Sequence, residues 1–234
     1  MLADRASRVT NLTVPGVGPY PRELSPSEPT AWIDIEQLEH VLDLAVERPA
    51  VRLSFDGGNC SDVHIALPRL VERGLTAEFF PLAGRIGDPG RIDRSGLREL
   101  VAAGMSIGSH GWEHRDWRAL DDAAAEQEIE LALRVLTEVS GQPVDRVSVP
   151  FGSYDRTVLR RLRQAGVTRA YTSDGGRARV NAWLQPRTIL RSDMTPEEVH
   201  LLVDGRTKLG PLRALRLGKR LNIGSWGAQL HISE

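Results

Sequence analysis

Apolar residues recur along the chain at two spacings, one typical of helices and one typical of buried strands. Three amphipathic segments with helical spacing each end at a glycine, at Gly74, Gly104 and Gly166. Glycine readily adopts the left-handed backbone conformation that ends a helix. A short apolar run follows each glycine at once, so this repeat predicts helices that lead directly into strands.

The same two spacings predict the other elements. Further helices are expected at Ile35–Val46, Asp122–Val139 and Pro196–Val203. Further strands are expected at Asn11–Val14, Val51–Phe55, Val147–Pro150 and Thr188–Leu190. Alternating strands and helices indicate an α/β fold with parallel strands. About seven such strands favour a barrel over a small open sheet.

Polar residues follow several of these predicted strands. Asp56 follows the strand at 51–55, His110 follows the apolar run at 105–109, and Asp174 follows the run that ends near Tyr171. In a parallel barrel the functional residues lie at the carboxyl ends of the strands. We therefore expect these side chains to share one rim and one pocket.

Composition narrows the classes of partner and compartment. The chain of 234 residues is 41% hydrophobic and 26% charged, as in ordinary globular proteins. Its 30 basic and 31 acidic residues nearly balance, which argues against a nucleic-acid partner. The single cysteine, Cys60, excludes an internal disulfide framework. With no signal-peptide pattern and no long apolar run, a cytoplasmic protein is expected.

The last part of the chain differs in composition. We expect one domain over residues 1–205 and a basic tail over 206–234. The stretch 206–221, RTKLGPLRALRLGKRL, combines basic residues with leucines and has no acidic residue. We favour a surface helix with packed leucines, and a peripheral contact with an anionic membrane or a lipid-linked substrate is the alternative. Residues 222–234 show no clear pattern, and the oligomeric state cannot be read from the sequence.

Two histidines four residues apart, His110 and His114, form the clearest candidate site. Such a pair can point at one metal ion if the segment is helical or tightly turned. Asp56 also has a simpler interpretation as a turn former before Gly57 and Gly58. The shared rim favours a functional site over a purely structural role for these residues.

Three stretches, SFDGGN, SHGWEH and VPFGSYD, resemble in order and spacing the motifs of the polysaccharide deacetylase family (the NodB-homology or carbohydrate esterase 4 group). The resemblance covers roughly residues 9 to 200. It implies a distorted (β/α) barrel of seven or eight strands. It also implies hydrolytic removal of an N- or O-acyl group from a sugar with the help of one divalent ion.

The resemblance also implies roles for individual residues. Asp56 matches the general base, and His110 and His114 match the two metal-binding histidines. Pro150, Phe151 and Gly152 match the motif that forms the wall of the groove. Beside these, we expect Asp174 and Arg187 to be catalytic and Asn59, Trp112 and Tyr154 to bind the substrate.

The chain departs from the family pattern at the metal ligands. Gly57 stands where the family has a metal-binding aspartate, and a glycine has no side chain to offer. The arginine that often begins the third motif is missing, and Ser148 stands near its place. Asp62 is our candidate for the missing ligand, with Asn59 and Cys60 as alternatives. The expected cofactor is one weakly bound divalent ion (zinc, cobalt, nickel or manganese), or none.

These features predict a hydrolase that acts on an N-acyl or O-acyl group of an amino sugar or related small molecule. The substrate can be soluble or lipid-linked. Because Gly57 interrupts the metal set, three alternatives stay open. The protein could work without a metal, catalyse a different reaction on a small metabolite, or bind carbohydrate without catalysis.

Overall fold

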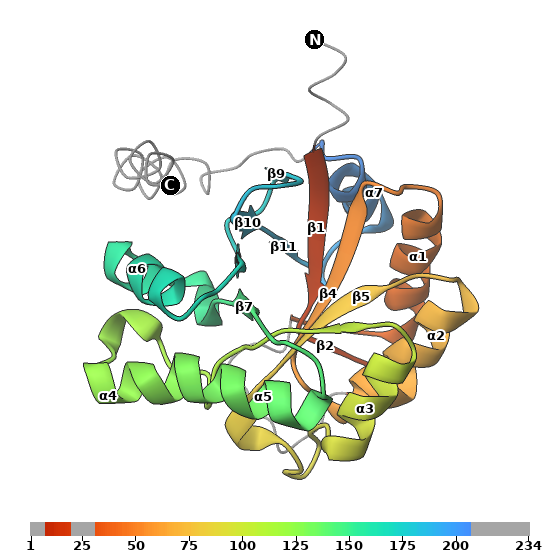
Figure 1. Cartoon of the computed structure of the whole chain (residues 1–234). Helices are drawn as coiled ribbons and strands as arrows, with labels where there is room; N and C mark the ends of the chain where they lie inside the picture. Colours follow the sequence, from red (N-terminus) through yellow and green to blue (C-terminus); the bar gives the residue numbers. More distant parts are fainter. Residues whose placement is uncertain (1–7, 20–30, 207–234) are drawn as a thin grey trace.

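A ring of parallel strands forms the centre of the molecule. The computed structural model describes residues 8–19 and 31–206, and the statements below concern these residues (Figure 1). The strands of the ring are β1 (Arg8–Val14), β4 (Val51–Gly57), β5 (Ala77–Pro81), β6 (Ser106–Ile107), β7 (Arg146–Ser148), β8 (Arg169–Thr172), and the pair β10 (Leu184–Pro186) and β11 (Thr188–Ile189).

Two sheets join to make this ring. The first has the order β11-β1-β4-β5-β6 and the second the order β10-β8-β7. A parallel bridge between Ser109 and Val147 connects them beyond β6. On the other side, the segment 184–189 pairs with β8 through its first half and with β1 through its second half. With β10 and β11 taken together, this is the distorted (β/α) barrel of seven parallel strands that the sequence predicts.

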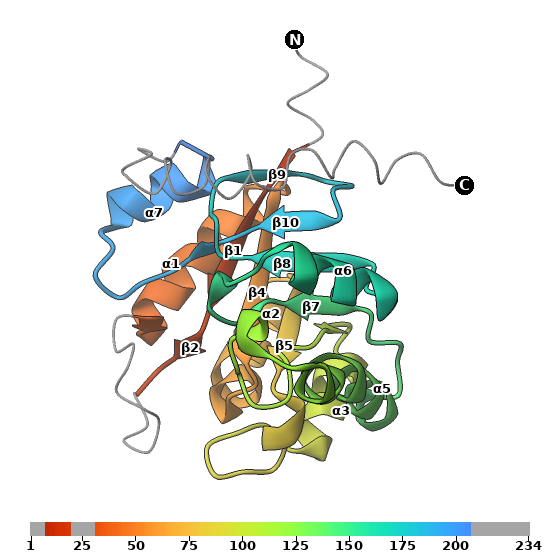
Figure 2. The same ribbon diagram turned by 90° about the vertical axis from the view of Figure 1, so that its left-hand side faces the viewer.

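The helices cover the outside of the strands (Figures 1 and 2). They are α1 (Ile35–Val46), α2 (Leu67–Glu72), α3 (Arg94–Ala102), α4 (Asp122–Ala125), α5 (Ala132–Ser140), α6 (Arg156–Gln164) and α7 (Pro196–Val203), with π-helical turns at Asp62–Ala66 and Glu126–Leu131. Short 3-10 turns lie at Ala83–Arg85, Trp117–Ala119 and Pro150–Gly152. In α1, residues at helical spacing such as Leu38, Val41, Leu42 and Ala45 are buried against the sheet.

The predicted helices at 35–46 and 196–203 are confirmed at both ends. The predicted helix at 122–139 is also confirmed, as α4, a π-helical turn and α5 in continuous succession. The sequence pattern missed three short strands, β2 (Gly16–Val17), β3 (Trp32–Ile33) and β9 (Arg177–Arg179), as well as β10. Runs of two or three residues are too short to show an alternation of apolar and polar positions.

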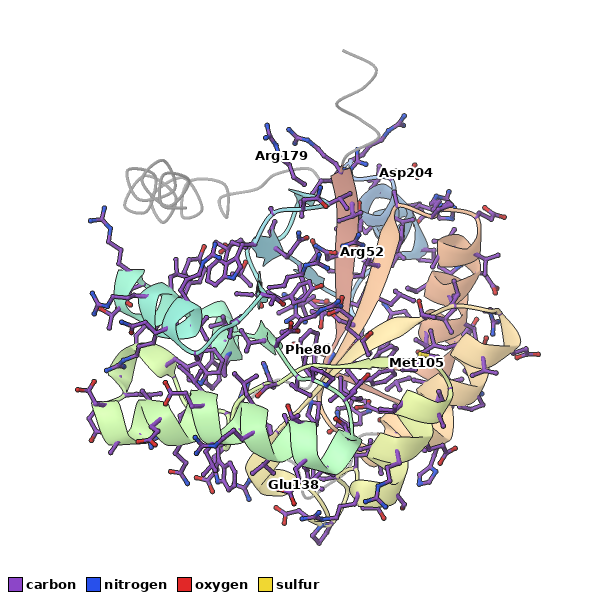
Figure 3. All side chains as sticks on the ribbon, in the orientation of Figure 1. Arg52, Phe80, Met105, Glu138, Arg179 and Asp204 are labelled. Carbon is purple, nitrogen blue, oxygen red and sulfur yellow. The ribbon has the colours of Figure 1, made fainter. Side chains whose placement is uncertain are left out.

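Apolar side chains on the outer face of the strands, Phe55 and Phe79 among them, pack with the helices into the main core. The rings of Phe55 and Phe79 stack with their centroids 4.8 Å apart. Phe80 is fully buried and lies at the middle of the molecule, whereas Glu138 and Asp204 lie at its outer edge (Figure 3). Burial on this scale stabilises the fold by about 25 cal/mol per Å² of apolar surface. The buried polar groups described below lie on the other face of the strands, inside the ring, where Arg187 contacts the rings of Phe80 and Tyr171.

The structure revises the ends of several predicted strands. The strand predicted at 147–150 is β7, which ends at Ser148, and Pro150 begins a 3-10 turn. β4 continues through Asp56 and Gly57, so Asp56 lies in the strand and not after it. The part of the chain described here has no helix long and apolar enough to cross a membrane. Residues 207–234, all but the first residue of the predicted basic tail, lie outside the described residues. Both interpretations of the stretch 206–221 therefore stay predictions.

Candidate active site

Asp56 and Arg187 form a buried ion pair at the carboxyl end of the strands. Arg187 donates from Nη1 to Asp56 Oδ1 over 2.8 Å and from Nη2 to Oδ2 over 2.7 Å. Arg187 is 1% exposed and Asp56 is 9% exposed. Burial alone would raise the pKa of Asp56, but the Arg187 guanidinium and its two hydrogen bonds lower that pKa to about 2. Asp56 is therefore an anion at every physiological pH.

Arg187 reaches this position because the strand is interrupted there. It lies between β10 and β11, where the chain passes from one sheet to the other. Its guanidinium also donates to Ser148 Oγ over 2.6 Å and to Ser54 Oγ over 3.0 Å. It lies over the rings of Phe80 and Tyr171, at 5.5 and 5.6 Å from their centroids. Ser148, which stands near the place of the arginine missing from the third motif, thus accepts a hydrogen bond from Arg187.

His110 lies beside this pair and is fixed in one orientation. Its Nδ1 lies 2.8 Å from the carbonyl oxygen of Ser148, so Nδ1 carries the proton and Nε2 is the nitrogen available to a ligand. Burial lowers the pKa of His110 below its ordinary value of 6.5, although the charge of Asp56 acts in the opposite direction. At neutral pH, His110 is a neutral imidazole with a free acceptor nitrogen.

His114 approaches His110 through a tight turn and not through a helix. The two ring centroids are 4.7 Å apart, and the His114 ring also packs against the tilted ring of Phe151 at a centroid distance of 4.3 Å. Both His114 and Phe151 have positive φ, at 63° and 56°. Such a conformation is uncommon for residues other than glycine and tends to occur at functional sites. Burial lowers the pKa of His114 to about 3, with His110 and Arg91 acting in the same direction.

Glu128 holds the turn between the two histidines. Its buried carboxylate accepts the backbone N–H groups of Trp112 and Glu113 over 3.0 and 2.9 Å. Gly111 adopts a φ of +94°, and a Cβ there would lie 2.5 Å from Glu128 Oε2. Only glycine fits this position without displacing the carboxylate. The turn is therefore set by a residue on the helical segment behind it, which no pattern in the sequence indicates.

A pocket of about 550 Å³ opens over these groups, which is within the usual range for small-molecule sites. Phe151, at 60% exposure, forms part of its rim. The residues that line it are Pro15, Asp56, Gly57, Leu82, Arg85, Asp88, Pro89, Arg91, His110, Glu113, His114, Val149, Phe151, Ser173 and Ile189. The prediction that Asp56, His110 and His114 face one pocket is thus consistent with their placement.

Comparison with known proteins places this arrangement in a family. The family model described as polysaccharide deacetylase matches residues 43–170, more than half of the chain. The chain belongs to the polysaccharide deacetylase family. The family match includes Asp56, His110 and Ser148, but it ends before Arg187.

Individual relatives are distant in sequence. The protein YxkH of Bacillus subtilis, whose name assigns it provisionally to the polysaccharide deacetylases, is 24% identical over 128 residues. That match covers 55% of this chain and 46% of the relative, so the chain spans about half the length of the curated relative it matches. The whole relative is therefore a guide to the family and not to the activity of this chain.

Solved structures show the same fold. The deacetylase PplD of Streptococcus pyogenes superposes with a TM-score of 0.74 at 17% identity, covering 84% of this chain and 98% of that one. A de-N-acetylase of Aggregatibacter actinomycetemcomitans gives a TM-score of 0.71 at 15% identity, covering 83% of this chain and 99% of that one. At this identity the likeness supports the fold.

Members of this family generally use a divalent metal ion, but the side chains described here do not complete a site for one. Within residues 8–19 and 31–206, no three His, Cys, Asp or Glu side chains are grouped so that they could hold an ion. His110 and His114 are close to each other, but both oxygens of Asp56 are occupied by Arg187. Gly57 has no donor. A set of two histidines falls short of the three protein ligands of hydrolytic zinc sites.

Asp62, the predicted third ligand, is not grouped with the histidines. It is buried at the start of a π-helical turn, and its Oδ2 accepts the backbone N–H of Asn59 over 3.0 Å. Its other oxygen, Oδ1, is buried without a hydrogen-bond partner among the described residues. Burial raises the pKa of Asp62 well above 3.8. The structure thus gives Asp62 a local capping role.

Replacing Asp62 with asparagine is expected to stabilise the protein at neutral pH. Burial raises the pKa of this carboxyl in the folded state. At any pH above 3.8, the pKa of the unfolded state, the ionisable Asp62 therefore lowers the free energy of unfolding. Urea unfolding of Asp62→Asn should show a higher free energy of unfolding than wild type at pH 7, with a gap that closes as the pH falls below 3.8. A less stable variant at pH 7 would contradict the assigned environment.

The other predicted residues lie around the pocket and do not line it. Asp174 accepts the hydroxyl of Tyr154 over 2.5 Å and that of Thr172 over 3.0 Å. The expectation that Asp174 shares the pocket is not met, although its neighbour Ser173 does line it. Tyr154, Pro150, Gly152 and Asn59 are buried, and Trp112 packs against the core. Of the predicted substrate-binding residues, only Phe151 faces the pocket.

Sequence reasoning missed Arg85, Asp88, Arg91 and Glu113, which all line the pocket. Three of them lie in the loop that follows β5. The stretch Asp88-Pro89-Gly90 is a turn signal in the segment between a predicted strand and the next helix, and loops after strands form the functional face of a barrel. That signal could have pointed to this loop as part of the site, but not to the direction of Arg91.

Proposed function

We propose that this protein is a hydrolase that removes an N-acyl or O-acyl group from an amino sugar or a related small molecule. The observation that carries the proposal is the orientation of His110. Ser148 fixes its Nδ1, which leaves the neutral Nε2 as an acceptor in a pocket beside the Asp56–Arg187 pair. A neutral imidazole held in one tautomer is well suited to remove a proton from water.

In the proposed reaction, a water molecule attacks the acyl carbonyl carbon and gives a proton to Nε2 of His110. The carbonyl becomes a tetrahedral oxyanion. When the intermediate collapses, the bond to the amine or alcohol breaks, and the leaving group takes the proton back from His110. The products are a carboxylic acid and the free amine or alcohol, so one water is consumed for each bond that is cleaved.

Asp56 has a supporting part in this proposal. Its negative charge favours the imidazolium that His110 becomes, as the direction of its effect on the pKa of His110 indicates. The family resemblance makes Asp56 itself the general base, and that assignment stays a prediction. A carboxylate with a pKa of about 2 is a weak base at neutral pH. His110 is the better placed of the two.

The pocket fits a substrate of limited size. Its volume suits one or two sugar rings, and its lining combines apolar groups with charges of both signs. The exposed ring of Phe151 offers an apolar face to a sugar. The sugar can be free or lipid-linked. For the stretch 206–221 we favour a surface helix, and contact with an anionic membrane is the alternative proposal. A cytoplasmic location likewise stays a proposal.

The test is product release by the full chain. N-acetylglucosamine, its short oligomers and O-acetylated xylose oligomers are offered at neutral pH, and acetate is measured by a coupled assay. Release well above a heat-inactivated sample supports the proposal. Saturable binding of these sugars without acetate release would instead favour a carbohydrate-binding relative, and release only from small amides would favour a repurposed hydrolase.

A further inference from the structure

We propose, on the basis of the proposed hydrolase function, that Arg91 occupies the space left by the missing metal ligand and binds the oxyanion of the reaction with its guanidinium. A positive charge carried by the chain itself would then stabilise the charge that develops on the carbonyl oxygen. The prediction that follows is hydrolysis that does not depend on added divalent ions.

The backbone fixes Arg91 at this place. Residues 58–60 and 90–92 run side by side, with Ile92 N–H donating to Gly58 O over 2.9 Å and Cys60 N–H to Gly90 O over 3.0 Å. An antiparallel bridge between Asn59 and Arg91 lies between these two hydrogen bonds. The loop after β5 is thereby attached to the end of β4, next to Gly57. Arg91 is a built part of the site and not a surface side chain that happens to lie near it.

The side chain fills the space in front of Gly57. Arg91 Nη1 donates to Asn59 Oδ1 over 2.7 Å and to the carbonyl oxygen of Gly57 over 3.2 Å. A Cβ placed on Gly57 would lie 3.2 Å from that same nitrogen, and Gly57 has a φ of +92° that other residues rarely adopt. A side chain at position 57 and the guanidinium of Arg91 thus compete for one volume. Asn59, which we expected to bind the substrate, instead positions Arg91.

The guanidinium keeps donors available for a ligand. It has five N–H groups, and the recorded contacts use Nη1. Among the described residues, no partner is recorded for its Nη2 or Nε, and no carboxylate lies within ion-pair distance. Arg85 and Arg187, by contrast, are paired with Asp88 and Asp56. Arg91 is therefore the pocket arginine whose charge is not directly neutralised in the part of the chain that the structure describes.

The position relative to the histidines suits an oxyanion. Arg91, His110 and His114 line the same pocket. A water held at Nε2 of His110 could attack a carbonyl whose oxygen points toward Arg91. Fixed donors aimed at a developing oxyanion in a partly buried site are among the largest contributions to catalysis. The same charge opposes the binding of a divalent cation between the histidines.

The first experiment measures cation binding and needs no turnover. Zinc and cobalt chlorides are titrated by calorimetry into the wild-type full chain and into Arg91→Gln and Arg91→Lys, with Arg94→Ala as control. Arg94 is exposed and three residues away, so the control loses the same charge outside the pocket. Arg91→Gln should bind the ions about tenfold more tightly or better than wild type, since a repelling charge is removed. Arg91→Lys and Arg94→Ala should stay weak.

The second experiment uses acetate, the simplest oxyanion product, as the probe. The ring proton resonances of His114 are followed by NMR as sodium acetate is added, with sodium chloride as the ionic-strength control. Wild type should show a saturable shift that Arg91→Gln loses and Arg91→Lys partly keeps. In the sugar assay, Arg91→Gln should lose about a hundredfold to a thousandfold in kcat, with little change in KM. Wild-type turnover should persist in a metal chelator.

The outcomes separate this inference from the proposed function. Turnover that is abolished by a chelator, or is unchanged in Arg91→Gln, overturns the role of Arg91 and leaves a hydrolase. If no substrate turns over, the proposed function fails, and the cation and acetate titrations still decide the inference. Equal cation affinity and equal acetate shifts in wild type and Arg91→Gln would then overturn it. Circular dichroism confirms that each variant is folded.

Discussion

Replacing Arg187 with alanine is expected to lower the free energy of unfolding by about 3–5 kcal/mol. The change leaves Asp56 buried without its counter-ion. It also removes the hydrogen bonds that the Arg187 guanidinium donates to Ser54 and Ser148. In the folded state, water cannot reach the buried carboxylate to replace the lost arginine. The loss of stability is therefore much larger than the net stabilisation that the ion pair contributes. Urea unfolding at pH 7, followed by circular dichroism, measures it.

Two controls make this prediction specific. Arg191→Ala breaks an exposed pair with Asp193, so it should cost only about 0–1 kcal/mol. The double variant Asp56→Ala with Arg187→Met removes both charges, and it should be more stable than Arg187→Ala alone. A double variant that is less stable than Arg187→Ala would contradict this explanation. It would show that the loss of stability comes from the missing ion-pair interaction and not from the unpaired charge of Asp56.

The pH dependence has a definite sign. The pKa of Asp56 is lowered to about 2 in the folded state from 3.8, so its stabilising effect is fully present above pH 3.8. That effect is lost as the pH falls through about 2, and it amounts to about 2 kcal/mol. The stability of wild type should therefore fall between pH 4 and 2 by more than that of the double variant, which lacks this carboxylate.

The fold could be predicted from the sequence because each of its units has a local signal. Helix α1 shows its buried face in the spacing of Leu38, Val41 and Ala45, and α7 begins with the capping box of Thr195 and Glu198. The closure of the ring has no such signal. It depends on the segment 184–189, whose two halves pair with different strands, and on the bridge between Ser109 and Val147. These contacts are set by the assembled barrel.

The sequence predicts those site residues that lie at or just after the ends of predicted strands. Asp56, His110 and His114 are near motifs that follow predicted strands, and the structure places all three in one pocket. Arg187 was singled out, but its partner lies 131 residues away in the sequence, so the ion pair could not be derived. Asp174 follows β8 at the correct rim, yet it is held by Tyr154 and Thr172. The direction of a side chain near a strand end is decided by neighbours that the pattern does not reveal.

Arg91 is a second residue whose position could not be predicted from the sequence. The sequence shows the loss at Gly57 plainly, because one aspartate is missing from a short motif. It does not show what fills the space, since the compensating residue comes from a loop more than thirty positions later. A substitution at one position of a motif is thus interpretable only together with the side chain that enters the vacated volume.

Replacing His110 with asparagine is expected to lower kcat for acyl hydrolysis by about a hundredfold to ten-thousandfold, the usual effect of losing a general base. Asparagine can still donate to the Ser148 carbonyl in place of Nδ1, so the turn should keep its shape while the acceptor at Nε2 is lost. His64→Asn is the matched control, because His64 is exposed on the helical segment after β4. It should leave the rate unchanged.

The pH profile of kcat/KM decides between His110 and Asp56 as the base. If His110 is the base, the wild-type rate should fall on acidification at a pH below 6.5, and this limb should be absent from the residual activity of His110→Asn. Asp56→Asn should move the limb to lower pH, because the charge that favours protonated His110 is gone. If Asp56 is the base, the rate should stay level until the pH approaches about 2, or until the protein unfolds. A level profile over that range, together with near-normal activity in His110→Asn, would return the role to Asp56.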